Sequence, residues 1–315
     1  MEHRYRPSIY YYMFGPYEPA LKLRSGDTIV TATADAGGSD SEGDPIPPEM
    51  LQRSEDTEYY EANPLVGPFF VEGASLGDTL AIKIEGIRLN RSTAYSKILP
   101  NFGSLTDEGP GKRLLLNQPL KEARYDWGLD LERKAGLIEL GGRRIEIPLE
   151  PFIGSIGVAP RFGTHQTSLT PGEYGGNMDC PETKEGTTLY LPVFVRGGYL
   201  SFGDIHAAQG DGEICGVALE TTAEVKLGIS LQKGKAIDWP RLEDSDHIMV
   251  AGSARPLMDA FKIAHLELTK WLASDYGFSI PDAFQILSQV GTCRIGNVVD
   301  TNYTVVAKFP KRYLR

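Results

Sequence analysis

The sequence predicts a mainly β protein, built from β-sandwich or jelly-roll-like and β-barrel elements, with a smaller C-terminal α+β portion. Three observations support this class: glycine (35) and proline (21) are frequent among the 315 residues, short apolar segments alternate with polar residues, and residues 1–250 lack long helical periods. We expect a β-rich region over residues 1–150, a central β region over 151–250 that carries the site, and an α+β portion over 251–315 packed on the β core.

The first half of the chain is predicted to form strands separated by tight turns. Segments rich in β-branched and aromatic residues, bounded by glycine, proline or aspartate, cover residues 8–14, 20–35, 67–87 and 137–152. Residues 67–87 are predicted to form a hairpin with Leu80, Ile82 and Ile84 on its buried face. Gly141-Gly142 is the expected connection of a second hairpin. Between them, residues 88–134 contain a glycine and proline cluster and are expected to form an irregular excursion that covers a site or an interface.

The period of the apolar residues changes near residue 250. Residues 213–231 still alternate as two strands. From Ser253 to Tyr276 apolar residues recur every three to four positions, which predicts an amphipathic helix that Ser253 caps and Gly277 ends. A second helix is predicted to begin at the capping box of Ser279, and a last strand to lie near residues 303–309.

The charge balance restricts the class of partner. The formal net charge is −10 and the pI is near 5.1. Phosphate binding needs a basic face, so we expect no nucleic-acid or anionic-membrane partner, and instead a small neutral or cationic one. No signal-peptide core or long apolar run is visible, and the three cysteines lack a CxxC spacing. These features predict free thiols in a reducing compartment and a soluble cytoplasmic protein.

The central stretch from residue 175 to residue 213 concentrates side chains that bind metals or transfer protons, namely Asp179, Asp204, His206, Asp211 and Glu213. Like charges this close repel each other unless a cation or shared protons relieve them. Asp204 and His206 stand two residues apart at a predicted strand end, so their side chains point to the same face. Glycines at 210 and 212 allow the chain to turn, so that Asp211 and Glu213 can face this pair.

Imidazole nitrogen together with carboxylate oxygens makes a divalent metal the expected cofactor, with zinc as the predicted ion. Manganese, iron and calcium become the alternatives as the number of oxygen ligands rises. Glu213 has two open roles, as a ligand or as a general base beside an activated water. A second function class is a structural calcium site in a non-catalytic binding protein or inactive relative. His206 discriminates between the classes, because calcium sites rarely use nitrogen.

Several motifs resemble the acetamidase/formamidase family over most of the chain: GPFFVEGASLGDTL, IGVAP, GGNMD, LYLPVFV, GDIHAAQGDGE and VVDTNYTVVAKFPK. The resemblance implies a mostly β fold with a mixed C-terminal part. It also implies hydrolysis of a short-chain aliphatic amide, of the formamide or acetamide type, to a carboxylate and ammonia. Together with the metal expected from the central stretch, this predicts a metal-dependent amidase. From the family resemblance and the irregular excursion together we expect a homodimer or a higher homo-oligomer.

Carried over residue by residue, the resemblance points to polar positions in GGNMD, GDIHAAQGDGE and TADAGG. The predicted metal ligands are Asp35, Asp179, Asp204, His206 and Glu213. The predicted catalytic residues are Glu213, Asp211 and Asp179, and the predicted substrate-binding residues are Asn177 and Gln209.

Some of these residues have a purely structural alternative. Asn177 follows two glycines, so its amide could serve only to stabilise a turn, and Gln209 is similar. His165 lies in a loop, where a lone histidine is more often a surface residue. Cys180 is a weak candidate nucleophile, because a thiolate needs a basic partner and its neighbours include Asp179 and Glu182.

Overall fold

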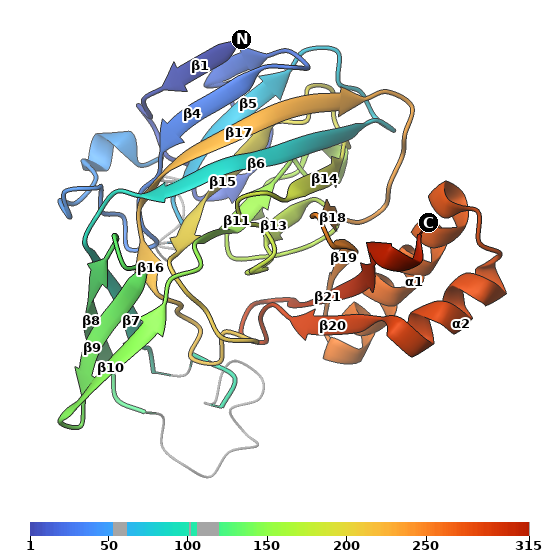
Figure 1. Ribbon diagram of the computed structural model, residues 1–315. Helices are drawn as coiled ribbons and strands as arrows, with labels where there is room; N and C mark the ends of the chain where they lie inside the picture. The colour runs from blue at the N-terminus through green and yellow to red at the C-terminus, as the bar shows by residue number, and fades with distance from the viewer. Residues whose placement is uncertain (53–61, 101, 106–119, 315) are drawn as a thin grey trace.

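The computed structural model describes residues 1–52, 62–100, 102–105 and 120–314. Within these residues the chain forms two large β-sheets and a C-terminal helical layer, which confirms the predicted mainly β class with a smaller α+β part. In Figure 1 strands β17 and β6 of one sheet cross in front of β15 and β5 of the other, and the helices lie to one side, against β19 and β21. None of the described helices is long and apolar enough to cross a membrane.

The first sheet has nine strands among the described residues. Their spatial order is β1 (Glu2–Tyr5), β4 (Thr28–Ala32), β17 (Ala223–Gln232), β6 (Thr79–Leu89), β14 (Thr188–Pro192), β18 (Arg241–Glu243), β19 (His247–Ala254), β21 (Tyr303–Pro310) and β20 (Thr292–Ile295). Helix α1 (Leu257–Tyr276) packs on β19 and β21, and α2 (Ile280–Val290) packs on α1. The C-terminal elements therefore extend the same sheet that the N-terminal strands begin.

The second sheet has ten strands in the described part of the chain. Its main path is β10 (Arg143–Pro148), β9 (Ala135–Leu140), β8 (Ala123–Asp130), β7 (Thr93–Ile98), β16 (Glu220–Thr221), β15 (Leu200–His206), β11 (Phe152–Gly157) and β13 (Gly175–Asn177). Strand β5 (Leu65–Val71) pairs with β15, and β3 (Leu21–Leu23) pairs with β5. The short strands β2 (Met13–Phe14) and β12 (Gln166–Thr167) pair with each other, and 3₁₀ turns occupy η1 (Pro48–Met50), η3 (Arg161–Gly163) and η4 (Lys311–Tyr313).

The main hydrophobic core lies between the two sheets. Leu80, Ile82 and Ile84 on β6 are fully buried, as their alternation predicts, and pack in the same cluster as Leu200 and Phe202 of β15. A second apolar cluster lies between α1 and the strands β19 and β21. Because β15 belongs to the main core and is buried along its whole length, polar side chains on it are held in place by dense packing.

Local predictions for one hairpin turn and two helix ends are confirmed, and one predicted helix cap is wrong. Residues Gly141 and Gly142 connect β9 and β10 as an antiparallel hairpin. Gly277 ends α1 in the left-handed conformation (φ 75°), and the Ser279 side chain caps α2 by accepting a hydrogen bond from the Asp282 backbone N–H. Ser253 does not cap α1 as predicted, because it lies inside β19 and Pro256 precedes the helix.

The predicted hairpin over residues 67–87 is wrong. Strand β5 pairs with β15 and β3 in the ten-stranded sheet, whereas β6 pairs with β14 and β17 in the nine-stranded sheet. The turn between β5 and β6 is thus a corner between the two sheets. An alternating pattern shows which face of a strand is buried but does not identify its neighbour.

Two other segments also differ from the prediction. The expected strand over residues 8–14 is reduced to β2 and isolated bridges at Tyr10 and Tyr11. Within the expected excursion at 88–134, β7 and β8 form a regular antiparallel ladder. Most of its glycine and proline cluster lies outside the described residues.

Candidate functional site

The candidate site is assembled around the end of β15. Its last residues, Asp204 and His206, are both buried, and Asp204 Oδ1 lies 3.3 Å from His206 Nε2. The predicted proximity of this pair is therefore confirmed. The neighbouring strand β11 places the Phe152 ring edge-to-face against the His206 ring, with 5.0 Å between the centroids. This packing restricts the imidazole to one orientation.

Gly154 on β11 allows two carboxylates to approach the same strand. A Cβ atom at this position would lie 2.7 Å from Asp204 Oδ2 and 2.9 Å from Asp179 Oδ1. Real Cβ atoms essentially never come this close to another heavy atom, so any larger residue would displace one of the two side chains. The glycine is thus a steric requirement of the site.

A hydrogen-bond network of neutral side chains holds these carboxylates. Asp204 Oδ2 accepts a hydrogen bond from Asn63 Nδ2 at 2.8 Å, and Ser155 Oγ lies 3.1 Å from the same oxygen. Asn177 Nδ2 donates to Asp179 Oδ2 at 3.0 Å and to Asp300 Oδ2 at 2.8 Å, while its oxygen accepts from Asn63 and Ser155. The Asn177 amide is fully used within the protein, so this structure supports a positioning role for it and not the predicted contact with substrate.

Gln209 determines which nitrogen of His206 carries a proton. Its Nε2 donates to the backbone oxygens of Asp179 and Gly296, which can only accept, so its Oε1 faces His206 Nδ1 at 2.8 Å. Nδ1 must therefore be protonated, and the lone pair of a neutral His206 lies on Nε2. These three contacts occupy the whole Gln209 amide. Like Asn177, Gln209 therefore positions a site residue, and the structure does not support the predicted contact with substrate.

His206 Nε2 points toward acidic side chains from two further segments. Glu220 on β16 is the cross-strand neighbour of His206, and its Oε1 lies 3.5 Å from Nε2. Glu213, after the turn at residues 210–212, places a carboxylate oxygen close enough to complete a group in which the His206, Glu213 and Glu220 ligand atoms lie within 4.8 Å of one another. Asp179, Asp204 and His206 form a second such group. His206 belongs to both groups.

The cluster concentrates buried negative charge. Among the described residues no lysine or arginine lies within ion-pair distance of the five carboxylates, which are Asp179, Asp204, Glu213, Glu220 and Asp300. Burial raises the pKa of Asp179, Glu220 and Asp300 well above the usual range, and neighbouring carboxylates add to the effect. Burial also raises the pKa of Glu213 to about 7. Protons or a cation must therefore compensate this charge at neutral pH.

Burial lowers the pKa of His206, but the nearby Glu220 and Asp204 carboxylates raise it by more, so its net shift is upward. Two oxygens in the cluster, Asp179 Oδ1 and Glu220 Oε2, are buried without a hydrogen-bond partner among the described residues. Unpaired carboxylate oxygens next to an imidazole Nε2 form the donor arrangement that a divalent metal uses, once the ion displaces the proton from Nε2.

The backbone is strained at the same place. Asp179, Asp204 and Glu213 have φ values of 43°, 61° and 48°, in the left-handed region that residues other than glycine rarely adopt. Left-handed residues of this kind concentrate at functional sites, where the surrounding structure holds them against their local preference. Because three carboxylate residues of the cluster share this strain, the surrounding structure must hold them in place, which indicates a functional site.

Two of the predicted acidic site residues, Asp211 and Asp35, lie outside the two ligand groups. Asp211 is on the surface, with a side chain 62% exposed, and forms an ion pair with Arg294 at 3.0 Å. This exposed position does not support its predicted catalytic role. Asp35 lies at the edge of the cluster, where its Oδ2 pairs with Arg91 at 2.7 Å and its Oδ1 accepts from the Ser39 backbone at 2.9 Å. Both Asp35 oxygens are thus occupied by the protein, which does not support the predicted ligand role.

His165 and Cys180, the weaker candidates from the sequence, agree with a purely structural role. His165 is exposed and packs against Tyr17, with 4.5 Å between the ring centroids. Cys180 is buried and its Sγ lies 3.2 Å from a carboxylate oxygen of Glu182. Burial and this carboxylate raise the pKa of Cys180, so the group is a thiol and not a thiolate.

Sequence reasoning missed four residues of the network: Asn63, Ser155, Glu220 and Asp300. Glu220 stands in the otherwise apolar and hydroxyl-rich run VALETT, and a glutamate inside a predicted buried strand was an available signal. Asp300 falls in the motif VVDTNY, which carries part of the family resemblance. Asn63 and Ser155 had no comparable signal, because single polar residues near strands are common.

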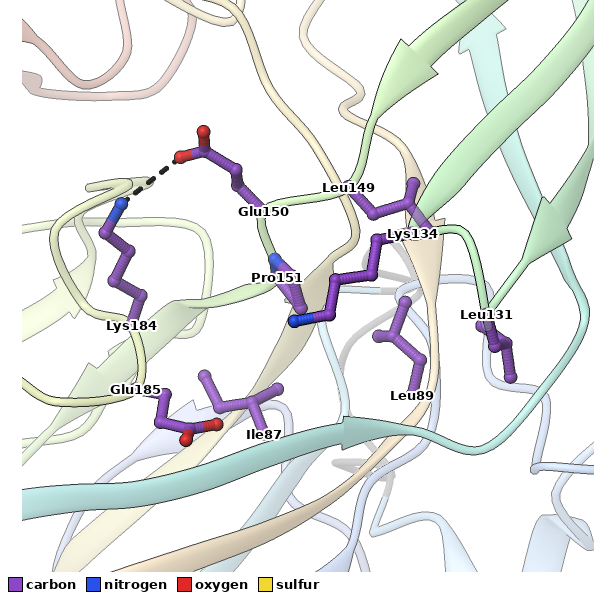
Figure 2. A pocket seen from close by; sticks show the side chains of 9 residues that line it. All are labelled: Ile87, Leu89, Leu131, Lys134, Leu149, Glu150, Pro151, Lys184 and Glu185. Carbon is purple, nitrogen blue, oxygen red and sulfur yellow. Dashed lines mark hydrogen bonds and ion pairs between the residues drawn. The ribbon is translucent and has the colours of Figure 1, made fainter.

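A cavity of about 400 Å³ opens beside the start of β11. Figure 2 shows an apolar floor that includes Leu89 and Leu149, with Lys134 extended across it and Lys184 paired with Glu150 at the edge. None of the cluster residues lines this cavity. The cavity and the cluster are therefore separate features.

Comparison with known proteins identifies similar chains. A family model described as the acetamidase/formamidase family matches residues 163–312. The solved structure of an acetamidase from Yersinia enterocolitica is 37% identical, with a TM-score of 0.87, and the match covers 100% of this chain and 93% of that one. An acetamidase structure from Bacillus halodurans is 31% identical over 99% of this chain and 98% of that one, with a TM-score of 0.82.

Among proteins compared by sequence, an acetamidase from Mycolicibacterium smegmatis is 29% identical over 221 residues. That match covers 54% of this chain and 53% of the relative, so the chain spans about half the length of this relative.

Proposed function

Since the chain belongs to the acetamidase/formamidase family, we propose that it hydrolyses a short-chain aliphatic amide, of the formamide or acetamide type, to a carboxylate and ammonia. The observation that carries this proposal is the buried cluster in which His206 Nε2 faces carboxylates of both ligand groups, while no lysine or arginine of the described residues forms an ion pair with them. A small neutral substrate agrees with the acidic composition of the chain.

We propose a divalent metal as the cation that compensates the cluster. The unpartnered oxygens of Asp179 and Glu220 fit such an ion, and so does His206 Nε2, which holds the lone pair when the ring is neutral. The residues that would hold it are Asp179, Asp204 and His206, or His206, Glu213 and Glu220. The nitrogen donor favours zinc, whereas the excess of carboxylates keeps calcium as the alternative. When bound, such an ion polarises an amide carbonyl and activates a water molecule.

The protein side chains supply the proton transfers. Hydrolysis adds water to the carbonyl carbon, breaks the C–N bond and requires a proton on the departing nitrogen. Glu213 is suited to this role, because its pKa of about 7 allows it to accept a proton from water and to release it again. Asp179 is close enough to Glu213 for the two carboxyl groups to affect each other's pKa, and it can share that proton. Gln209 keeps the His206 proton on Nδ1 throughout.

The test is ammonia release from formamide, acetamide, propionamide and urea, with metal content measured on the same preparation. We expect turnover of at least one short aliphatic amide, its loss on chelation, and its return with zinc. Glu213→Gln should reduce turnover by about 10²–10⁴-fold, as expected for loss of a general base. Asp211→Asn, on the exposed carboxylate two residues away, should leave it unchanged.

Other results would reject the proposal. Turnover that survives complete removal of metal would contradict the metal role but not the amidase activity. Bound calcium with no turnover of any amide would favour the non-catalytic binding protein. A homodimer or higher oligomer and a cytoplasmic location are further proposals, which light scattering and fractionation test.

A further inference from the structure

A small cavity of about 110 Å³ lies between α1 and the nine-stranded sheet. Arg241 on β18 is aligned with Tyr190 on β14 and with Val250 on β19. Aligned residues on neighbouring strands point to the same face, and Val250 belongs to the apolar cluster under α1. Arg241 therefore points toward the helix, where β18, β19 and α1 meet in Figure 1. None of the residues that line this cavity belongs to the carboxylate cluster.

Arg241 is a buried residue whose side chain forms no hydrogen bond or ion pair within the described residues, and its Nε is itself buried. The residue is only 8% exposed, and its Nε has no hydrogen-bond acceptor in the described part of the chain. Its guanidinium packs on the Trp271 ring, whose centroid lies 4.9 Å from the guanidinium carbon. An arginine carries five N–H donors, and a buried charge without a partner is strongly unfavourable.

The other charged groups around the cavity are paired among themselves. Asp275 accepts hydrogen bonds from Lys235 at 2.8 Å and from the Trp271 indole at 3.1 Å. Glu243 accepts one from Tyr190 at 2.9 Å and pairs with Lys311 at 2.6 Å. Neither carboxylate lies within ion-pair distance of Arg241. The guanidinium is thus the uncompensated charge in this cavity.

The electrostatics agree with that assignment. Burial lowers the pKa of Arg241, and the carboxylates of Asp275, Glu267 and Asp238 offset this only in part. Arginine nevertheless stays protonated at neutral pH, so the positive charge persists inside the cavity.

We propose that this cavity is a binding site for a small oxyanion, separate from the proposed catalytic site. A guanidinium presents parallel N–H donors that match two oxygens of a carboxylate or phosphate. Trp271 holds the guanidinium on one side, and the Lys235 ammonium supplies further donors at the cavity wall. A volume of about 110 Å³ limits the ligand to the size of formate, acetate, phosphate or sulfate. Binding of a small anion at this site would stabilise the packing of α1 on the nine-stranded sheet.

The test compares the wild type with Arg241→Met in thermal unfolding and titration calorimetry. Sodium formate, acetate, phosphate and sulfate are added separately at constant ionic strength. For the wild type we expect a Tm that rises with anion concentration and saturates, and a matching saturable heat. Arg241→Met should lose both responses. Arg241→Lys keeps the charge without the paired donors, and should bind about tenfold more weakly.

The anions also separate the two sources of the ligand. A response to formate and acetate identifies a carboxylate, whereas a response to phosphate and sulfate identifies a tetrahedral oxyanion. Any anion binding at the catalytic cluster would be the same in both proteins and would cancel in the comparison. In anion-poor buffer Arg241→Met should be as stable as the wild type, because it removes an unpaired buried charge.

Equal anion responses in the wild type and Arg241→Met would overturn the inference. So would a marked fall in Tm of Arg241→Met in anion-poor buffer, since it would mean that the protein already compensates the guanidinium. Neither outcome depends on whether the protein hydrolyses amides.

Discussion

Replacing Gly154 by alanine should disable the site while leaving the fold in place. The added Cβ would lie 2.7 Å from Asp204 Oδ2, 2.9 Å from Asp179 Oδ1 and 3.0 Å from the Asp204 backbone oxygen. Since ordinary contacts begin at 3.4 Å, the two carboxylates must move by roughly 0.5–0.7 Å, or β11 must shift. Both side chains are already buried and hydrogen-bonded, so neither can rotate away freely.

The size of the effect follows from this displacement. Misplacing a catalytic group by about 1 Å can cost about 10²-fold in rate, which corresponds to about 2.7 kcal/mol in the transition state. We therefore expect Gly154→Ala to lower kcat/KM for the best amide substrate by about 10- to 100-fold and to weaken metal retention. The free energy of unfolding should fall by about 1–3 kcal/mol, the usual cost of inserting a methyl group into a packed region.

Gly210→Ala provides the matched control. It lies in the turn before Glu213, and a Cβ there would meet nothing within 4 Å. Ammonia release, metal content and Tm should all stay near the wild-type values. The reasoning fails if Gly154→Ala retains wild-type kcat/KM and metal content, because the strand would then absorb the methyl group without moving either carboxylate.

Three further predictions concern single side chains. His206→Ala should cut amide turnover by at least about 10³-fold with the fold retained; wild-type turnover together with retained metal would exclude His206 as a ligand. Gln209→Leu should lower metal affinity or turnover by about 10–100-fold through loss of imidazole orientation, and an unchanged metal dissociation constant and rate would argue against this role. Burial raises the pKa of Asp78, but hydrogen bonds from Lys233 and backbone N–H groups lower it by more, so its net shift is downward. We therefore expect the wild type to have a higher free energy of unfolding than Asp78→Asn, with the full difference present above about pH 4. The difference should disappear as the pH falls through the lowered pKa of Asp78 in the folded protein. Urea unfolding at pH 7, 5 and 3 measures this difference, and a value that does not change with pH would contradict the prediction.

The sequence alone determined the features that depend on near neighbours in the chain. The helix ends at Gly277 and Ser279 follow from a left-handed cap and a side-chain cap, which act within one turn. The buried face of β6 follows from strand alternation. The closeness of Asp204 and His206 follows from a spacing of two residues on one strand.

Only the tertiary structure decided which distant segments meet. Strands β5 and β6 are consecutive in the chain but belong to different sheets, because the same apolar face can be buried against either one. The site likewise needs Asn63, which lies 141 residues from Asp204, and Asp300, which lies 123 residues from Asn177. The unpaired state of Arg241 depends on where the neighbouring carboxylates find their own partners. Pairing over such separations is set by how the sheets stack, and no local pattern encodes it.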